Sequence, residues 1–381
     1  MGIQIDNRYP KLLPASRWIR HKHIEALISY AERSKNLITS KIGESEEGRT
    51  LHTIRWGRGD KRLFIWTQMH GNEPTASHAL DQFIQDLEHN PELQVLKDKI
   101  QIAIIPLLNP DGAERFQRRN ALGIDLNRDA VARSSKEMKV FFRFMENFNP
   151  TWAFNMHDQR NIFSVGAQDI CASLSFLAAS PDENRSISLE RKASMQLISA
   201  LMPNLEAQLS GHFGRYTDEF YPKALGDNLM KMGIPNILFE AGYFPNDDLR
   251  TKASALISNA LIDSVQLIAE DKWQFVDTEN YFLIPENKQK LRDLILRAVK
   301  FRNCKMDLAL MKKEIPNPDR DELDLVYELV DIGDLSHLKG ITEKEGGQIN
   351  SLKDININQL ANFSLDDGQL YNFKDGVLQP L

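Results

Sequence analysis

The chain has few cysteines, no long apolar run and no block of basic residues. Only Cys171 and Cys304 are cysteines among its 381 residues, which excludes a disulfide framework. No apolar run reaches the roughly 20 residues that span a bilayer, so we expect no membrane partner. Without a basic block, and with a formal charge of −6, nucleic acid is not an expected partner. Because the N-terminus also lacks a secretory pattern, we expect a cytoplasmic protein.

The remaining composition is that of an ordinary globular protein, with 42% apolar and 26% charged residues. Apolar runs alternate with amphipathic helical patterns up to about residue 275. This predicts an α/β domain over residues 1–275, with a mixed, mostly parallel twisted sheet and helices on both faces. Short alternating runs separated by turns then predict a small β-rich domain of unknown role over residues 276–381. The oligomeric state cannot be read from these patterns.

The periodicity also predicts individual elements of the first domain. Buried strands are expected at 63–67, 100–105, 152–156 and 236–239. Helices are expected at 24–37, 189–209 and 249–270, with Pro203 as a break in the second of these.

A His-x-x-Glu pair, His70 and Glu73, follows two residues after the apolar run 63–67. Gly71 is expected to let the backbone turn there, and Pro74 to begin a helix. Zinc in a hydrolase takes three protein ligands and keeps a fourth position for water. One turn of chain would therefore supply two of the three ligands.

His157 ends the short apolar strand 152–156 and is the candidate third ligand for one zinc ion per chain. The alternative interpretation is a helix-capping Asn72 beside a solvated Glu73, with His157 a satisfied residue of the sheet. A second His-x-x-Glu copy at residues 89–92 follows a helix rather than a strand, and we do not expect it to bind metal.

Two further elements lie between these ligands in the sequence. The turn sequence 109–112 follows a predicted strand, and the segment 118–128 ends in the pair Asn127–Arg128. Near a zinc site such a pair is a natural clamp for a carboxylate, because the guanidinium fork binds both oxygens and the amide adds a donor. The alternative is a solvated surface loop.

Glu240 ends an apolar run, 236–239, that is too apolar to be exposed. A carboxylate buried there costs free energy unless it is paired or protonated. Two interpretations follow: a general base with a shifted pKa, or a buried salt bridge with a partner such as Arg118 or Lys231.

In this order the elements resemble the zinc carboxypeptidase family, the clan of carboxypeptidase A. Residues 43–49 resemble the family's lead-in before the first strand. The other matching elements are His70–Glu73, Asn109–Gly112, Arg118–Arg128, His157 and Glu240. The resemblance covers about residues 20 to 270. The compact spacing of segment 118–128 is more similar to bacterial murein-peptide amidases and succinylglutamate desuccinylase-like members than to digestive carboxypeptidases.

The resemblance implies the roles of the residues around the metal. His70, Glu73 and His157 would hold zinc. Glu240 would act as general base and then as general acid. Asp125 would lie behind the first zinc histidine and fix its tautomer.

It also implies the residues that contact substrate. Arg118 would polarise the scissile carbonyl and stabilise its oxyanion. Asn127 and Arg128 would grip the terminal carboxylate. Tyr216 and Tyr221 are both candidates for the family's mobile tyrosine.

Three positions depart from the family pattern, namely Asp129, Asp158 and Gln159. They leave the side-chain specificity open. The expected function is a zinc metallocarboxypeptidase that hydrolyses an amide bond next to a free terminal carboxylate, with a peptide as substrate. The alternatives are an N-acyl amino acid deacylase of the aspartoacylase or desuccinylase type, acting on acylated amino acids, and an inactive peptide-binding homologue.

Overall fold

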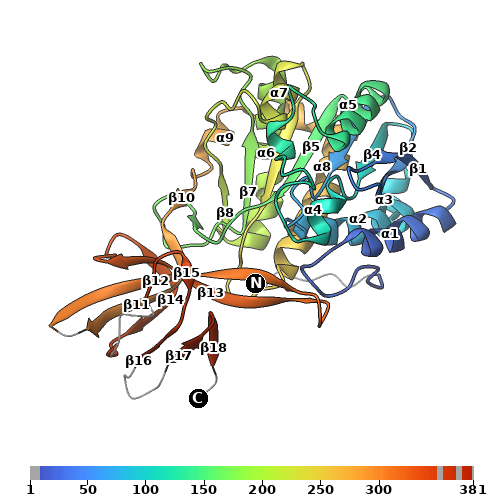
Figure 1. Cartoon of the computed structure of the whole chain (residues 1–381). Coiled ribbons are helices and arrows are strands. Elements are labelled where there is room, and N and C mark those ends of the chain that lie inside the picture. The colour runs from blue at the N-terminus through green and yellow to red at the C-terminus, as the bar shows by residue number, and fades with distance from the viewer. Residues whose placement is uncertain (1–8, 302, 350–354, 366–370, 380–381) are drawn as a thin grey trace. The chain divides into compact units, whose positions relative to one another are not determined.

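The computed structural model describes residues 9–301, 303–349, 355–365 and 371–379 (Figure 1). The chain forms two compact units. The first contains the residues up to Gln159 together with Ala172–Asn287, and the second contains Arg160–Cys171 together with the chain from Lys288 onward. The chain therefore leaves the first unit at residue 160 and returns to it at residue 172. The sequence patterns did not indicate this excursion.

The first unit is built on an eight-stranded sheet in the order β1-β2-β4-β3-β5-β9-β7-β8. Its strands are β1 (Leu37–Glu44), β2 (Thr50–Gly57), β3 (Lys61–Trp66), β4 (Ile100–Ile105), β5 (Trp152–Asp158), β7 (Leu174–Ala178), β8 (Phe213–Arg215) and β9 (Asn236–Ala241). The central pairs β4-β3, β3-β5 and β5-β9 are parallel, as is the edge pair β7-β8. The pairs β1-β2, β2-β4 and β7-β9 are antiparallel. The predicted mixed, mostly parallel sheet is confirmed.

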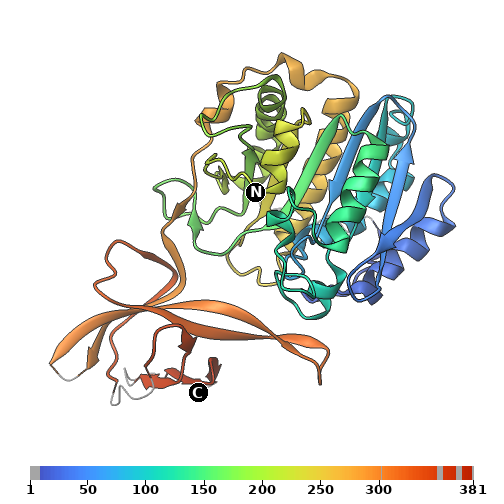
Figure 2. The same ribbon diagram turned by 45° about the horizontal axis from the view of Figure 1, so that its top comes forward.

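Helices cover both faces of this sheet (Figure 2). They are α1 (His21–Arg33), α2 (Thr75–His89), α3 (Pro91–Gln94), α4 (Pro110–Glu114), α5 (Lys136–Phe148), α6 (Leu189–Leu209), α7 (Leu225–Lys231), α8 (Thr251–Ala269) and α9 (Asn280–Leu283), with 3-10 turns η1 (Leu126–Arg128) and η2 (Lys272–Phe275). Within β3, Leu63 and Ile65 join the core cluster that contains α1, α2, α6 and α8. Phe64 and Trp66 join the opposite cluster with α5 and α7. A strand buried on both faces explains the continuous apolar run.

Three local expectations were wrong. The first helix ends at Arg33, and Leu37 instead begins β1. The turn sequence 109–112 opens the short helix α4, which Asn109 caps by accepting a hydrogen bond from the Gly112 amide at 2.9 Å. Helix α6 continues through Pro203. Leu201 and Leu205, two residues before and after the proline, are buried, so packing outweighs the one lost backbone hydrogen bond.

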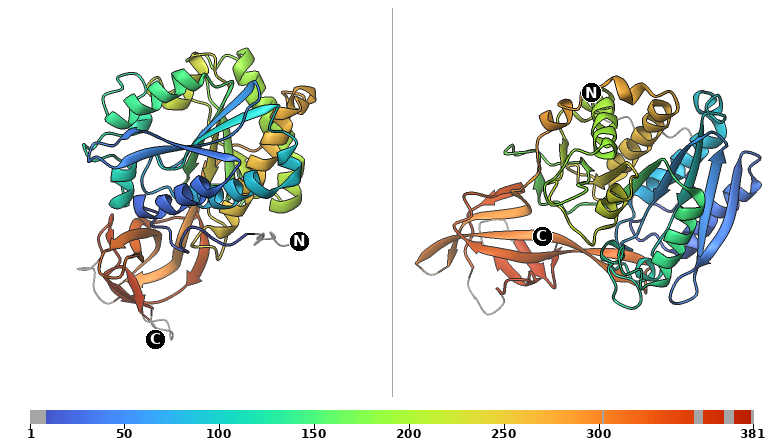
Figure 3. Two further views of the ribbon diagram at one scale, coloured as in Figure 1. Left: turned by 90° about the vertical axis from the view of Figure 1, so that its right-hand side faces the viewer. Right: turned by 90° about the horizontal axis from the view of Figure 1, so that it is seen from above.

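The second unit is β-rich, as expected of the C-terminal region (Figure 3). A five-stranded sheet has the order β14-β11-β12-β13-β15, a three-stranded sheet contains β16-β17-β18, and β10 pairs with β6. Their bounds are β6 (Phe163–Ser164), β10 (Lys288–Gln289), β11 (Leu291–Phe301), β12 (Cys304–Asn317), β13 (Glu322–Gly333), β14 (Lys339–Glu345), β15 (Gln359–Leu360), β16 (Phe363–Leu365), β17 (Tyr371–Lys374) and β18 (Val377–Gln379). The boundary expected after residue 275 stays a prediction. Among the described residues, no helix is long and apolar enough to cross a membrane.

Candidate metal centre and catalytic site

The candidate site is formed at the carboxyl ends of three neighbouring parallel strands, β3, β5 and β9. This is where ligand crevices form in open α/β sheets. His70 follows β3, whereas His157 and Glu240 each lie one residue before the end of their strand. Strands β5 and β9 thus continue two residues past the positions where the apolar runs stop. Their ladder fixes both side chains at the sheet edge.

The turn that presents His70 depends on Gln68, which sequence reasoning missed. Gln68 adopts φ +44°, a left-handed backbone conformation that is costly for a residue with a side chain. Its amide donates to the carbonyls of Ile19 and Gly71, and its Oε1 accepts from Ser77. The turn expected at Gly71 is present as well, because Gly71 and Asn72 form a turn in which the Glu73 amide donates to the His70 carbonyl at 3.1 Å. Gly71 is needed for another reason: a Cβ there would meet the Gly112 carbonyl carbon at 2.1 Å.

His70, Glu73 and His157 converge as a buried cluster. His70 Nδ1 lies 2.8 Å from Glu73 Oε1, and His157 Nδ1 lies 2.8 Å from Glu73 Oε2. The two Nδ1 atoms are 3.1 Å apart. Ligand atoms about 2.0–2.1 Å from a tetrahedral zinc ion lie roughly 3.3 Å from one another, so the cluster is slightly tighter than a zinc-loaded one. Two imidazoles and one carboxylate are a donor set that catalytic zinc takes.

Charge within the cluster shifts each pKa. Burial favours neutral groups, but Glu73 and Asp125 outweigh it and raise the pKa of His70. Burial dominates at His157 and lowers its pKa, although Glu73 opposes this. The two histidines overcome the burial of Glu73 and lower the pKa of its carboxyl group. The cluster therefore contains an ionised carboxylate, as a metal ligand must be.

Asp125 lies behind the first histidine, on the side away from the cluster. Its Oδ1 is 3.2 Å from His70 Nε2 and also accepts a hydrogen bond from the Asn127 amide at 3.0 Å. A carboxylate at Nε2 favours the tautomer with the proton on that atom, which leaves the Nδ1 lone pair free for a ligand. Burial raises the pKa of Asp125, but His70 and Arg118 outweigh it and lower that pKa.

Glu240 is the register partner of His157 on the neighbouring strand. Burial, together with the negative charges of Glu73 and Asp158, raises the pKa of Glu240 well above its ordinary value. Its Oε2 is buried without a hydrogen-bond partner among the described residues. Arg118 pairs with Glu73 and Asp125 instead. In the described part of the chain, the salt bridge weighed as an alternative for Glu240 is not formed.

Arg118 reaches the rim of the metal cluster. Its Nε donates to Asp125 Oδ2 at 3.0 Å, and its Nη1 lies 3.3 Å from Glu73 Oε1. The side chain is 43% exposed, so the guanidinium has one side toward the cluster and another toward solvent. A cation in this position can meet negative charge that develops on a bound carbonyl oxygen.

Asn127 and Arg128 continue directly from Asp125 through η1. Asn127 Oδ1 accepts a hydrogen bond from the Leu225 amide at 2.9 Å, which ties this turn to the start of α7. Arg128 is exposed, and its guanidinium carbon lies 5.0 Å above the ring centre of Tyr221. The structure thus brings Tyr221 to Arg128. Tyr216 lies just past β8, where its amide bonds to the Phe176 carbonyl.

Part of the chain matches the model of a known protein family. The family model described as zinc carboxypeptidase matches residues 24–202. This match covers just under half of the chain. It contains the three clustered side chains His70, Glu73 and His157 together with Asp125 and Arg118.

Two curated carboxypeptidases show the extent of the sequence likeness. Carboxypeptidase 2 of Trichophyton tonsurans is 32% identical over 26% of this chain and 19% of its own length. Carboxypeptidase M of Mus musculus is 28% identical over 30% of this chain and 30% of its own length. The chain spans less than a third of the length of these curated carboxypeptidases.

Solved structures share the fold. A metallo-carboxypeptidase from Burkholderia cenocepacia superposes with a TM-score of 0.55 at 18% identity, covering 66% of this chain and 69% of that one. Carboxypeptidase A from Helicoverpa armigera gives 0.53 at 15% identity, covering 66% and 74%. The first unit of the chain therefore has the zinc carboxypeptidase fold.

The residues that depart from the family pattern have structural partners in the first unit. Asp129 accepts hydrogen bonds from the Ser134 and Ser135 amides at 2.8 Å and so shapes the turn before α5. The Gln159 side chain bonds to the Ala172 carbonyl and to Asn287. We find no sign in these contacts that either residue is kept free for substrate.

Asp158 follows His157 in the sequence, and sequence reasoning gave it no role. Its Oδ2 accepts from Thr75 Oγ1 at 2.7 Å and lies 3.2 Å from Arg17 Nη2. Its amide donates to Glu73 Oε2 at 3.2 Å. Asp158 therefore positions Glu73 and adds to the negative field at Glu240. Its place directly after His157 is a signal in the sequence, but its partner Arg17 lies far away along the chain.

The second His-x-x-Glu copy, at residues 89–92, forms no metal cluster among the described residues. His89 Nε2 contacts the Tyr30 hydroxyl at 3.0 Å, whereas Glu92 accepts from Gln266. The two side chains of this copy therefore contact different partners.

Proposed function

We propose that this chain is a zinc-dependent carboxypeptidase that hydrolyses the amide bond next to a free terminal carboxylate. The observation that carries the proposal is the convergence of His70, Glu73 and His157 beside Glu240, a carboxyl group with a raised pKa. The family match over residues 24–202 supports the class of chemistry.

In this proposal His70, Glu73 and His157 hold one zinc ion through two Nδ1 atoms and the carboxylate. Zinc, when bound, supplies a Lewis acid at the scissile carbonyl and lowers the pKa of water toward about 7. Asp125 keeps the proton of His70 on Nε2, so that Nδ1 stays a ligand.

Glu240 takes the proton of the attacking water and later gives it to the leaving amine. A carboxyl group does both near neutral pH only if its pKa is raised, and burial beside Glu73 and Asp158 does this. Arg118 donates hydrogen bonds to the carbonyl oxygen as negative charge develops there, a role that its half-exposed position beside Glu73 supports.

Asn127 and Arg128 bind the substrate's terminal carboxylate. The Arg128 guanidinium can donate two parallel hydrogen bonds to the carboxylate. The side-chain amide of Asn127 can donate as well, because the Leu225 amide bonds only to its Oδ1 atom. Tyr221, whose side chain is half exposed over the Arg128 guanidinium, is our choice over Tyr216 for the tyrosine that contacts substrate.

The experiment is a substrate panel for the purified, zinc-loaded protein. It contains short peptides with a free C-terminal carboxylate, the same peptides as C-terminal amides, and N-acyl amino acids. The proposal predicts release of one C-terminal residue from the free peptides and at least 100-fold slower cleavage of the amides. Faster cleavage of N-acyl amino acids than of any peptide would favour a deacylase. Peptide binding without any cleavage would favour an inactive homologue.

A further inference from the structure

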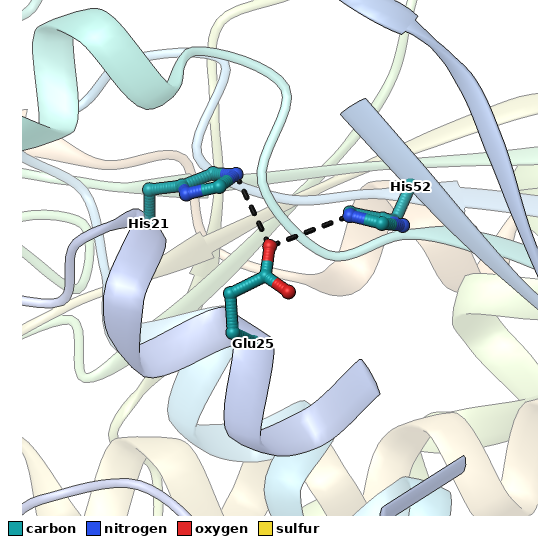
Figure 4. Close-up of side chains that lie close together, drawn as sticks. All are labelled: His21, Glu25 and His52. Atoms are coloured by element: carbon teal, nitrogen blue, oxygen red, sulfur yellow. Dashed lines mark ion pairs between the residues drawn. The ribbon is translucent and has the colours of Figure 1, made fainter. Parts of the chain in front are cut away.

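A second cluster of imidazole and carboxylate groups lies outside the catalytic site. It consists of His21 and Glu25 on α1 and His52 on β2, and Figure 4 shows both rings directed at the same carboxylate oxygen. Glu25 Oε1 is 3.3 Å from His21 Nε2 and 3.3 Å from His52 Nε2. The three ligand atoms all lie within 4.8 Å of one another.

The fold holds these three side chains in place. His21 and Glu25 are four residues apart on α1, so they share one face of that helix. The opposite face of α1 is buried through Ile24, Leu27, Ile28 and Ala31, which fixes the helix against the sheet. His52 lies in the middle of a paired strand, opposite Lys41 of β1. The side chains of His21, Glu25 and His52 remain partly exposed, which leaves access for an ion.

The spacing suits a shared metal ion better than two hydrogen bonds. A charge-assisted N–H···O bond is about 2.7–2.9 Å long, shorter than either 3.3 Å contact. Two ligand atoms about 2.0–2.1 Å from a tetrahedral ion lie roughly 3.3 Å apart. His21 Nε2 also lies 3.0 Å from the Thr50 carbonyl oxygen, a hydrogen-bond distance, so His21 gives up this hydrogen bond when its Nε2 atom binds an ion.

We propose that His21, Glu25 and His52 form a second metal site, which takes a divalent transition metal ion of the zinc and cobalt class. Two imidazoles select such ions over calcium and magnesium, which prefer oxygen ligands. With one carboxylate the donor set carries a single negative charge, which favours a dication. Bound there, the ion joins the start of α1 to β2 and stabilises this part of the fold. The site does not depend on the proposed peptidase function.

Cobalt(II) binding to the full chain tests this site. The catalytic cluster is first disabled with His157→Ala, the protein is stripped with a chelator, and bound cobalt is counted after dialysis at increasing free Co²⁺. The proposal predicts one equivalent with the intense visible bands of four-coordinate Co²⁺, and a rise in Tm on adding metal. Adding His52→Gln or Glu25→Gln is expected to weaken binding at least 100-fold and to abolish the rise in Tm.

The matched control is His337→Gln, which removes an exposed histidine of the second unit. It is expected to leave the cobalt equivalent and the Tm rise unchanged. Equal cobalt binding by the His157→Ala protein with and without His52→Gln would overturn the proposal, as would no binding at all. Glu25→Gln alters no buried side chain, so it keeps the test valid if His52→Gln does not fold.

Discussion

Glu240 and His157 are register partners on the adjacent parallel strands β9 and β5. Paired residues of neighbouring strands lie about 4.8 Å apart and point to the same side of the sheet. The backbone ladder therefore sets the distance between a proposed metal ligand and the proposed proton carrier. Both groups belong to the rigid sheet and not to a loop, so neither needs to be ordered when substrate binds.

Glu240→Gln is expected to lower turnover at least 100-fold, because glutamine keeps the shape but cannot take a proton. Zinc content is expected to stay unchanged, since Glu240 is not among the three clustered side chains. Steady-state kinetics on a cleaved peptide check this, with Glu206→Gln, an exposed change on α6, as the control. Full turnover by the Glu240 variant would remove the base assignment.

Asp125→Asn is expected to weaken zinc binding 10- to 100-fold. The amide can still contact His70 Nε2, but it no longer favours the protonated tautomer by charge. Competition with a chromogenic chelator measures the affinity. Asp98→Asn, which alters an exposed ion pair with Arg58, is the control and should match the wild type. Equal zinc affinity in both variants would show that Asp125 does not support the centre.

Arg128→Lys is expected to raise KM about 10- to 100-fold for peptides with a free carboxylate, because lysine keeps the charge but loses the fork. The change in kcat should be smaller. Tyr221→Ala, which removes the ring under the Arg128 guanidinium, should act in the same direction. Tyr216→Ala is the comparison for the second tyrosine. An effect of Tyr216→Ala larger than that of Tyr221→Ala would reverse our choice between them.

The raised pKa of Asp227, on α7, predicts that the stability of the protein depends on pH. Burial raises its pKa from the ordinary 3.8 to about 7, although the amides of Tyr221 and Ser180 oppose this. The fold therefore favours the protonated form. The stability that this preference contributes is complete below about pH 4 and is lost as the pH rises to about 7. At neutral pH the ionised group is a cost of up to about 4 kcal/mol.

Asp227→Asn removes this titration, so the variant should gain stability over the wild type as the pH rises from 4 to 7, with little further change above that. Urea midpoints measured at several pH values give the difference directly. Parallel pH profiles for the two proteins would contradict the shifted pKa.

The three strands that carry the site could be predicted because each is buried on both faces and therefore reads as an apolar run. His70, His157 and Glu240 were found from the ends of those runs. The bends were harder to predict: nothing local indicates that Gln68 adopts a left-handed conformation, which its three side-chain hydrogen bonds hold.

Contacts between distant parts of the chain that do not lie at strand ends could not be predicted. Arg17 and Asp158 pair across 141 positions, and residues 160–171 join the second unit through the pairing of β6 with β10. The choice between Tyr216 and Tyr221 is of the same kind, since it depends on where the chain around Arg128 packs. The four-residue spacing of His21 and Glu25 can be read from the sequence. The contact of His52 with Glu25 cannot, because it depends on how α1 packs beside β2.

The zinc content of His157→Ala tests the central claim most directly. The measurement is made in a His52→Gln background, so that the second cluster does not contribute, and zinc is counted after purification by elemental analysis. The account predicts about one zinc per chain with His157 present and almost none in His157→Ala. Full zinc occupancy in His157→Ala would contradict it, because the ion would then be held elsewhere.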